Sequence, residues 1–269
     1  MKDIILKADK ISYSVDKKNS FSGYQSVEIL KNISFEVERG KVHGISGQSG
    51  SGKSTLAKIL AGVYPQTSGI IQKNFKKDWS KSLPKPVQIL FQNDGELINP
   101  FRKVKDVLNE AFELKLKINK IYTTEIDDIF LRFNLNPQLK ESKGSQLSGG
   151  EKQRIALARI VIVEPEILVL DEPFSSQDVE AQLGILNLIK KLKEELDLTI
   201  ICISHDLNIL KHFSDDLIIM FKGNIVESGS TETVIDNPAN DYTKFLLSAQ
   251  SLNLTEADIQ TFHKNYEQN

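Results

Sequence analysis

Residues 47–54 constrain the fold of this chain more than any other segment. They read Gly-Gln-Ser-Gly-Ser-Gly-Lys-Ser and fit the pattern G-x-x-x-x-G-K-[ST], between an expected strand at 41–46 and a helical pattern that begins at Ser54. Glycines let such a loop turn its backbone N–H groups around phosphate oxygens. Lys53 is expected to reach the β- and γ-phosphates, and the Ser54 hydroxyl to bind Mg²⁺. A flexible Gly/Ser turn is the alternative, but the register between strand and helix favours a phosphate loop.

The composition narrows the remaining possibilities. The 269 residues carry 34 Lys and Arg against 36 Asp and Glu, a net charge of −2, which argues against wrapping nucleic acid by electrostatics alone. The single cysteine, Cys202, excludes an internal disulfide, a four-cysteine zinc site and an iron–sulfur cluster held by the chain's own thiolates. The apolar runs are too short for a membrane helix or a signal peptide. We therefore expect a soluble, cytoplasmic chain that reaches a membrane only through a partner.

Hydrophobic periodicity predicts strands that alternate with helices, which is typical of an α/β fold with a parallel sheet. Ile33, Phe35 and Val37 alternate with polar residues, as in a half-buried strand. Lys222 and Gly223 are expected to turn a hairpin. The expected strands are 33–37, 41–46, 87–91, 166–170, 199–204, 217–221 and 224–227.

A helical run from Val104 to about Lys140 interrupts this alternation. Thr123 or Thr124 is expected to cap one of its helices, and a further helix is expected from Glu151. The interruption predicts an inserted helical subdomain. The predicted organisation is an ATPase core at 1–92 and 165–235, the helical subdomain at 93–164 and a short C-terminal extension at 236–269.

Polar side chains follow several of the expected strands. Asp171 can hold the magnesium shell and Glu172 can polarise an attacking water, although adjacent acids also occur as solvated strand ends. His205 follows its strand at the edge where parallel sheets place ligands, and Gln92 has the same relation to its own strand. The alternatives are a structural role for His205 and a surface position for Gln92.

Residues 147–154 read Leu-Ser-Gly-Gly-Glu-Lys-Gln-Arg and predict a second anion site. Ser148 can cap the helix that follows, and the two glycines expose its first backbone N–H groups. Because the chain already has one phosphate loop, a second cradle indicates a nucleotide bound by a neighbouring subunit. A capped helix start without a ligand is the alternative.

The lysine-rich segment 72–86 allows two interpretations. Its lysines could form an anion-binding strip or the solvated surface of a loop, and blocks of like charge favour the second. The lysines concerned are Lys73, Lys76, Lys77, Lys81 and Lys85.

Together these segments resemble the ATP-binding cassette (ABC) superfamily over roughly residues 3–248. The matching parts are the phosphate loop, Gln92, the signature at 147–151, Asp171-Glu172 and the switch histidine His205. The resemblance implies an α/β fold of the P-loop NTPase type, with an N-terminal antiparallel β part, a mostly parallel sheet and an inserted α-helical subdomain. It also implies that two cassettes pack head to tail, with each ATP between the phosphate loop of one and the signature of the other.

The resemblance implies roles for individual residues. Glu172 would be the general base, His205 would position the γ-phosphate, and Lys53 would neutralise phosphate charge. Ser54, Gln92 and Asp171 would organise Mg²⁺, with Gln92 also near the attacking water. The residues implied to contact ATP are Tyr13, Gly47, Ser49, Gly50, Ser51, Gly52, Lys53, Ser54, Thr55, Ser148, Gly149, Gly150, Glu151 and Asp178.

Tyr13 is the aromatic residue expected to stack on adenine. It lies in Ile11-Ser12-Tyr13, ahead of a long segment that holds Phe21 and Tyr24 as rival candidates. A tyrosine in the core or on the surface is the further alternative for Tyr13.

A narrower resemblance is to the oligopeptide/dipeptide/nickel uptake cassettes. It rests on Phe91-Gln92 followed by Ile98-Asn99-Pro100, and on Asn237-Pro238 followed by 241–244. This resemblance implies an importer ATPase subunit at the cytoplasmic face of the membrane, with a second ABC ATPase subunit, two membrane permease subunits, an extracytoplasmic substrate-binding protein and no nucleic acid. The implied cargo classes are peptides, nickel and metal–chelator complexes.

Two segments depart from the family pattern. Glu151 replaces the usual glutamine of the signature and places a carboxylate near the partner's nucleotide. Ser176 and Gln177 replace an apolar pair before Asp178, which favours a non-identical partner cassette. Two rival functions remain open, namely a soluble cassette ATPase of DNA repair or translation and a small-molecule kinase or GTPase. The second rival would not need the signature.

Overall fold

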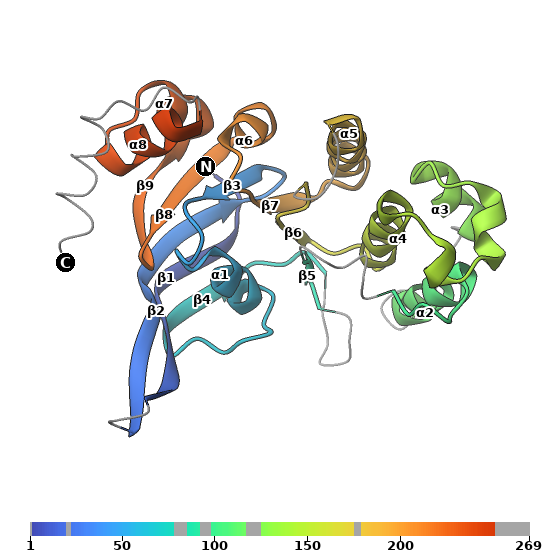
Figure 1. Ribbon diagram of the computed structural model, residues 1–269, viewed down its shortest axis with the longest axis horizontal. Coiled ribbons are helices and arrows are strands. Elements are labelled where there is room, and N and C mark those ends of the chain that lie inside the picture. Colours follow the sequence, from blue (N-terminus) through green and yellow to red (C-terminus); the bar gives the residue numbers. More distant parts are fainter. Residues whose placement is uncertain are drawn as a thin grey trace. The chain divides into compact units, whose positions relative to one another are not determined.

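The computed structural model describes residues 2–19, 23–77, 85–91, 98–116, 125–174 and 179–250 (Figure 1). The chain divides into two compact units, Met1–Asn74 with Ile201–Asn269 and Phe75–Ile200, which are called the first and the second unit below. Within the described ranges, no helix has the length and apolar character needed to cross a bilayer. The predicted division into core, helical subdomain and C-terminal extension stays a prediction.

An antiparallel sheet forms the N-terminal part of the first unit. Its strands are β1 (Ile4–Asn19), β2 (Gly23–Glu38) and β4 (Ser68–Lys73), in the order β2-β1-β4. Ile33 and Val37 are buried whereas the intervening Ser34 and Glu36 are exposed, so the predicted alternation is confirmed. The expected antiparallel β part is therefore present.

Buried parallel strands carry the phosphate loop in the same unit. β3 pairs parallel with β8, and β8 turns at Lys222-Gly223 into the antiparallel β9 (Figure 1). The positive φ angles of 44° at Lys222 and 83° at Gly223 suit a tight hairpin turn, as predicted. The other bounds are β3 (Val42–Ser46), α1 (Lys53–Leu60), β7 (Thr199–Ile203), α6 (Leu207–Phe213), β8 (Asp216–Phe221), β9 (Asn224–Ser230), α7 (Thr231–Asp236) and α8 (Asp241–Gln250).

The second unit joins a parallel strand pair to several helices. β5 pairs parallel with β6, α4 packs against β5, and α2 packs against α4. Together with the first unit this gives an antiparallel sheet and a mostly parallel one, the α/β P-loop NTPase fold that the sequence predicts. The bounds are β5 (Val87–Leu90), α2 (Val104–Leu116), α3 (Ile126–Arg132), α4 (Gly149–Ile162), β6 (Ile167–Asp171) and α5 (Val179–Leu196), with short 3₁₀ helices at Pro137–Glu141 and Gly144–Gln146.

Three predicted boundaries in this unit were wrong. The N-cap of α3 is Glu125 and not Thr123 or Thr124, because Glu125 and Asp128 exchange side-chain to backbone contacts as a capping box. The fourth helix starts at Gly149, ahead of the predicted Glu151, since Ser148 already caps it. The segment from Pro137 winds as a 3₁₀ helix and not as an α-helix.

The lysine-rich segment faces carboxylates of its own chain. The backbone N–H groups of Lys76 and Lys77 donate to Glu166 at 2.8 and 2.9 Å, and Lys77 Nζ lies 3.2 Å from Glu164. Burial raises the pKa of Glu164, but hydrogen bonds and charge from Lys115 and Lys77 outweigh it, so the pKa lies below its ordinary value. These contacts favour the surface-loop interpretation over an anion-binding strip. Lys81 lies outside the described residues.

A buried histidine makes the first unit sensitive to acid. His43 Nε2 accepts a hydrogen bond from the Glu38 N–H at 2.9 Å, and Nδ1 lies 3.7 Å from Asp216 Oδ2. Burial lowers the pKa of His43 below its ordinary 6.5, despite nearby Asp215 and Asp216 and with a smaller contribution from Lys41. The unfolded chain therefore binds this proton more readily than the folded one.

The contribution of His43 to the free energy of unfolding should thus be fully present above pH 6.5, the ordinary pKa of histidine. It should be lost as the pH decreases toward the pKa of His43 in the folded state. We expect the urea midpoint to decrease between about pH 7.5 and about pH 5.5, and the decrease to be smaller in H43Q. H212Q is the matched control, because His212 is exposed on α6. An equal acid loss in H43Q and the unaltered chain would contradict the assignment.

Candidate functional site

Glycines at two positions of the phosphate loop are required by close backbone approaches. Gly47 has a φ of 144°, and a Cβ there would lie 2.0 Å from the carbonyl oxygen of Met220. Gly52 has a φ of 101°, and its Cβ would lie 2.7 Å from Leu30 Cδ2. The loop is therefore pressed against β2 and β8, whereas a Cβ at Gly50 would meet no atom within 4 Å. Gly50 marks the open side of the loop.

Polar groups of the phosphate loop suit an anion. Lys53 is 8% exposed, and its Nζ donates to the carbonyls of Gly47 at 2.6 Å and Gln48 at 3.0 Å. Ser51 Oγ is buried and has no hydrogen-bond partner within the described ranges. No side chain caps the start of α1, which presents the positive end of its helix dipole at this loop. A buried ammonium, a buried hydroxyl and a helix N-terminus fit phosphate oxygens, and the exposed Ser54 hydroxyl fits a hard cation such as Mg²⁺.

Tyr13 belongs to an aromatic pair. Its ring stacks on Tyr64 with 5.7 Å between centroids and 6° between planes, and Lys58 Nζ lies 5.4 Å from the Tyr64 ring. Tyr24 is 75% exposed, and Phe21 lies outside the described residues. Sequence reasoning missed Tyr64, because no periodic pattern marks a loop residue after α1. Stacking of Tyr13 on adenine stays a prediction.

The two predicted carboxylates end β6 in the second unit. Asp171 is 5% exposed, so the strand delivers it in a buried position. Glu172 has a φ of 53°, in the left-handed region that side-chain-bearing residues rarely occupy. Such local strain is typical of functional positions and aims the Glu172 side chain in a direction that a regular strand end would not.

His205 follows β7 and is exposed, at the predicted sheet edge. Its backbone carbonyl accepts a hydrogen bond from the Gln250 side chain. Gln92 and Asp178 lie outside the described residues, so their predicted roles stay predictions.

The signature forms a complete capping box at the start of α4. Ser148 Oγ accepts from the Glu151 N–H at 3.3 Å, while Glu151 Oε2 accepts from the Ser148 N–H and Oγ–H, both at 2.8 Å. The Glu151 carboxylate, a departure from the family pattern, therefore binds Ser148 in the single chain. A Cβ on Gly149 or Gly150 would meet no described atom within 4 Å, so nothing in the described chain requires glycine at these positions.

The predicted site residues divide between the two units. The phosphate loop and His205 belong to the first unit, whereas Asp171, Glu172 and the signature belong to the second. Each unit thus carries its own group of candidate residues: a loop suited to phosphate in the first, and carboxylates with an open helix start in the second.

Comparisons with known proteins agree with this geometry. Residues 30–175 match the sequence profile of the family described as ABC transporter. The dipeptide transport ATP-binding protein DppF of Haemophilus influenzae is 36% identical over 87% of this chain and 73% of its own length. The oligopeptide transport ATP-binding protein OppF of the same organism is 32% identical over 96% of this chain and 85% of its own.

Among solved structures, cbiO1 from Clostridium perfringens, described as part of the ABC transporter complex cbiONQ, is similar to this chain. The TM-score is 0.71 and the identity 28%, covering 98% of this chain and 100% of cbiO1. A phosphate loop, a carboxylate pair and a capped signature thus occur together in a chain with these relatives. The chain therefore belongs to the ABC transporter family and is one of its ATP-hydrolysing subunits.

Proposed function

We propose that this chain is the ATPase subunit of an importer for dipeptides or oligopeptides. The observation that carries the proposal is a phosphate loop and a separate open signature, in a chain similar over most of its length to dipeptide and oligopeptide transport ATP-binding proteins. Nickel and metal–chelator complexes are the other cargo classes that uptake assays would reveal.

In the proposed reaction, the phosphate loop binds ATP and Lys53 neutralises phosphate charge. Ser54, Gln92 and, through water, Asp171 would hold Mg²⁺, which supplies positive charge against the β- and γ-phosphates when bound. Glu172 accepts the proton of the attacking water, and His205 orients the γ-phosphate. Most of the rate enhancement then comes from positioning and electrostatics on a loose phosphoryl transition state.

The signature would complete the site of a partner cassette. Gly149 and Gly150 have open space in front of them, and the N–H groups at the start of α4 carry the positive end of the helix dipole. A phosphate group from another subunit fits such an opening. We propose a non-identical cassette as this partner because Ser176-Gln177 departs from the family pattern.

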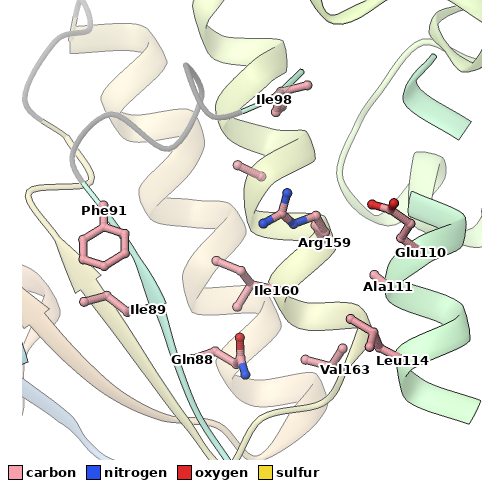
Figure 2. Close-up of a pocket in the computed structure, with 11 residues that line it drawn as sticks. Gln88, Ile89, Phe91, Ile98, Glu110, Ala111, Leu114, Arg159, Ile160 and Val163 are labelled. Atoms are coloured by element: carbon pink, nitrogen blue, oxygen red, sulfur yellow. The ribbon is translucent and has the colours of Figure 1, made fainter. Parts of the chain in front are cut away.

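A groove in the second unit is proposed to receive a membrane permease subunit. Figure 2 shows it between β5, α2 and α4. Its volume is about 370 Å³. Most of its lining is apolar, and such a groove suits an apolar side chain of a short amphipathic segment from a permease loop. The apolar lining residues are Ile89, Phe91, Ile98, Ala111, Leu114, Ala156, Ile160 and Val163.

Two charges lie on the helical sides of this groove. Glu110 of α2 is paired with Arg102, whereas Arg159 of α4 is exposed and has no ion-pair partner in the described ranges (Figure 2). An uncompensated guanidinium beside an apolar groove fits a partner segment that presents an acidic residue next to its apolar anchor.

The substitution R159E should therefore reduce permease binding. We expect recovery of the permeases with the tagged full chain to fall at least about tenfold, because a repelling charge replaces an attracting one. ATP binding should be unchanged, since Arg159 belongs to the second unit and the phosphate loop to the first. The measurement is quantitative pull-down from detergent-solubilised membranes of the native host, with K190E on α5 as the control for adding negative charge.

Unchanged permease recovery by R159E would contradict docking in this groove. Recovery of nucleic acid or ribosomes in place of hydrophobic membrane proteins would support the rival soluble ATPase and reject the importer. Permease association would place the chain at the cytoplasmic face of the membrane, with an extracytoplasmic substrate-binding protein on the other side.

A further inference from the structure

The C-terminal helix α8 touches the two segments of the first unit that the proposed reaction uses. α8 begins at Asp241 and ends at Gln250 (red in Figure 1). Tyr242 in its first turn contacts the phosphate loop, and Gln250 in its last turn contacts the His205 segment. Neither contact is needed to terminate or cap α8 itself.

The first contact fixes a corner of the phosphate loop. The Gln48 N–H donates to the Tyr242 hydroxyl at 3.0 Å. Tyr242 is 0% exposed, and its ring packs on Phe221 of β8 with 4.4 Å between centroids. A fully buried hydroxyl on a packed ring gives the loop an acceptor at a fixed position.

That corner also sets the position of the Lys53 ammonium. Lys53 Nζ donates to the carbonyls of Gly47 and Gln48. The Gly47 carbonyl belongs to the same peptide group as the Gln48 N–H, and the Gln48 carbonyl belongs to the next peptide group. A change in the orientation of Gln48 therefore moves the carbonyls that hold Lys53 Nζ. The Tyr242 hydroxyl thus influences, through Gln48 alone, the position of the Lys53 ammonium that is proposed to neutralise phosphate charge.

The second contact fixes the backbone beside His205. The Gln250 amide donates through Nε2 to the His205 carbonyl and accepts through Oε1 from the Leu207 N–H at 2.8 Å. One side chain thereby binds the peptide groups on both sides of Asp206, which caps α6. The two bonds restrict the backbone from which the His205 side chain projects.

The end of α8 lies beside a cavity. The cavity has a volume of about 400 Å³ and lies between α6, α7 and α8, with Leu207, Lys211, Leu247 and Gln250 in its lining. Gln250 contributes the polar contacts to the His205 segment at this end. The start of α8 is held differently, because Asn240 Oδ1 accepts from the Tyr242 N–H at 2.9 Å and the Asn240 N–H donates to Glu227 of β9 at 3.2 Å.

We infer that α8 is a positioning element for ATP hydrolysis, with Tyr242 setting the phosphate loop and Gln250 setting the His205 segment. The inference rests on the proposed roles of Lys53 and His205. The two residues should affect different steps. Tyr242 acts on a loop that contacts the phosphates of ATP and ADP alike, whereas Gln250 acts on a residue proposed to contact only the γ-phosphate.

The first test removes the Tyr242 hydroxyl alone. Y242F keeps the ring against Phe221, but the Gln48 N–H must find another acceptor, and nucleotide binding must restore the corner. We expect affinity for ADP and for a non-hydrolysable ATP analogue to fall about tenfold, measured by calorimetry on the full chain. K244Q is the control on the same helix, because the Lys244 side chain is exposed and pairs with Asp241.

The second test uses Q250A. We expect kcat for ATP to fall roughly tenfold while the KM and the affinity for ADP stay unchanged, since only the γ-phosphate contact is disturbed. Q138A is the matched control on an exposed glutamine of a 3₁₀ helix. Thermal unfolding of every variant separates stability from positioning.

The outcomes distinguish this inference from the proposed function. If the unaltered chain neither binds nor hydrolyses ATP, the proposed function fails. If the unaltered chain is active and Y242F matches K244Q, or Y242F loses only thermal stability, the role of Tyr242 is overturned. Loss of ADP affinity in Q250A equal to that in Y242F would overturn the separate role of Gln250.

Discussion

E172Q is expected to abolish ATP turnover while ATP still binds. The amide has nearly the shape of the carboxylate and tolerates the same left-handed backbone, but it cannot accept the proton of the attacking water. General-base catalysis is worth about a hundred- to ten-thousandfold, so phosphate release should fall by that factor. ATP affinity should stay within about twofold, because Lys53 and the phosphate loop are unaltered.

The variant should also accumulate a nucleotide-bound dimer, because ATP that is not hydrolysed would stay between the two cassettes. Size-exclusion chromatography with and without ATP would detect this species, and E180Q on α5 controls for the loss of one carboxylate. Phosphate release at the unaltered rate in E172Q would remove Glu172 from the role of base.

S148R is expected to impair hydrolysis of the nucleotide held by a partner cassette. The arginine places a long side chain in the open space before Gly149 and Gly150 and removes the Ser148 cap. Loss of the transition-state contacts made by this helix start should reduce turnover at the partner's site at least about a hundredfold. The affinity of the altered chain for its own ATP should change little, because the phosphate loop is untouched.

Mixing S148R with a K53A chain makes this test specific, because in the mixed dimer the K53A signature faces the S148R phosphate loop. This one site is intact, so turnover should return, whereas a signature acting in cis would leave both sites inactive. S148T is the matched control, since threonine can also cap a helix, and the lost cap in S148R should cost about 1 kcal/mol of stability. A loss of ATP affinity confined to the altered chain would reject the arrangement in trans.

Much of the fold was accessible from local patterns. The buried strands β3, β6 and β7 and the hairpin at Lys222-Gly223 follow from apolar runs and turn residues that act over a few positions. The β-ribbon of β1 and β2 extends beyond the predicted 33–37, because its outer residues are polar and periodicity marks only strands with one buried face. The cap at Glu125 was missed for a different reason, because threonine is the commoner capping residue and therefore favoured Thr123 or Thr124.

Some residues of the candidate site could be predicted from the sequence, and others could not. Lys53, Asp171 and Ser148 are marked by short motifs whose spacing reports their chemistry. Tyr64 and Tyr242 carry no such mark, because their contacts with Tyr13 and Gln48 join positions distant in the sequence. Only a folded chain shows that a tyrosine in the C-terminal helix binds the phosphate loop.

At Glu172 the stability of the fold and the rate of turnover make opposite demands, because the left-handed backbone favours glycine whereas the proposed reaction needs the carboxylate. Glycine adopts a φ of 53° without the steric cost borne by glutamate, so E172G would relax the strand end and raise the free energy of unfolding by about 1 kcal/mol. The same change would delete the carboxylate proposed to take the proton from water. Selection for heat resistance alone would therefore favour variants that no longer hydrolyse ATP. A screen that also measures phosphate release would retain glutamate at this position.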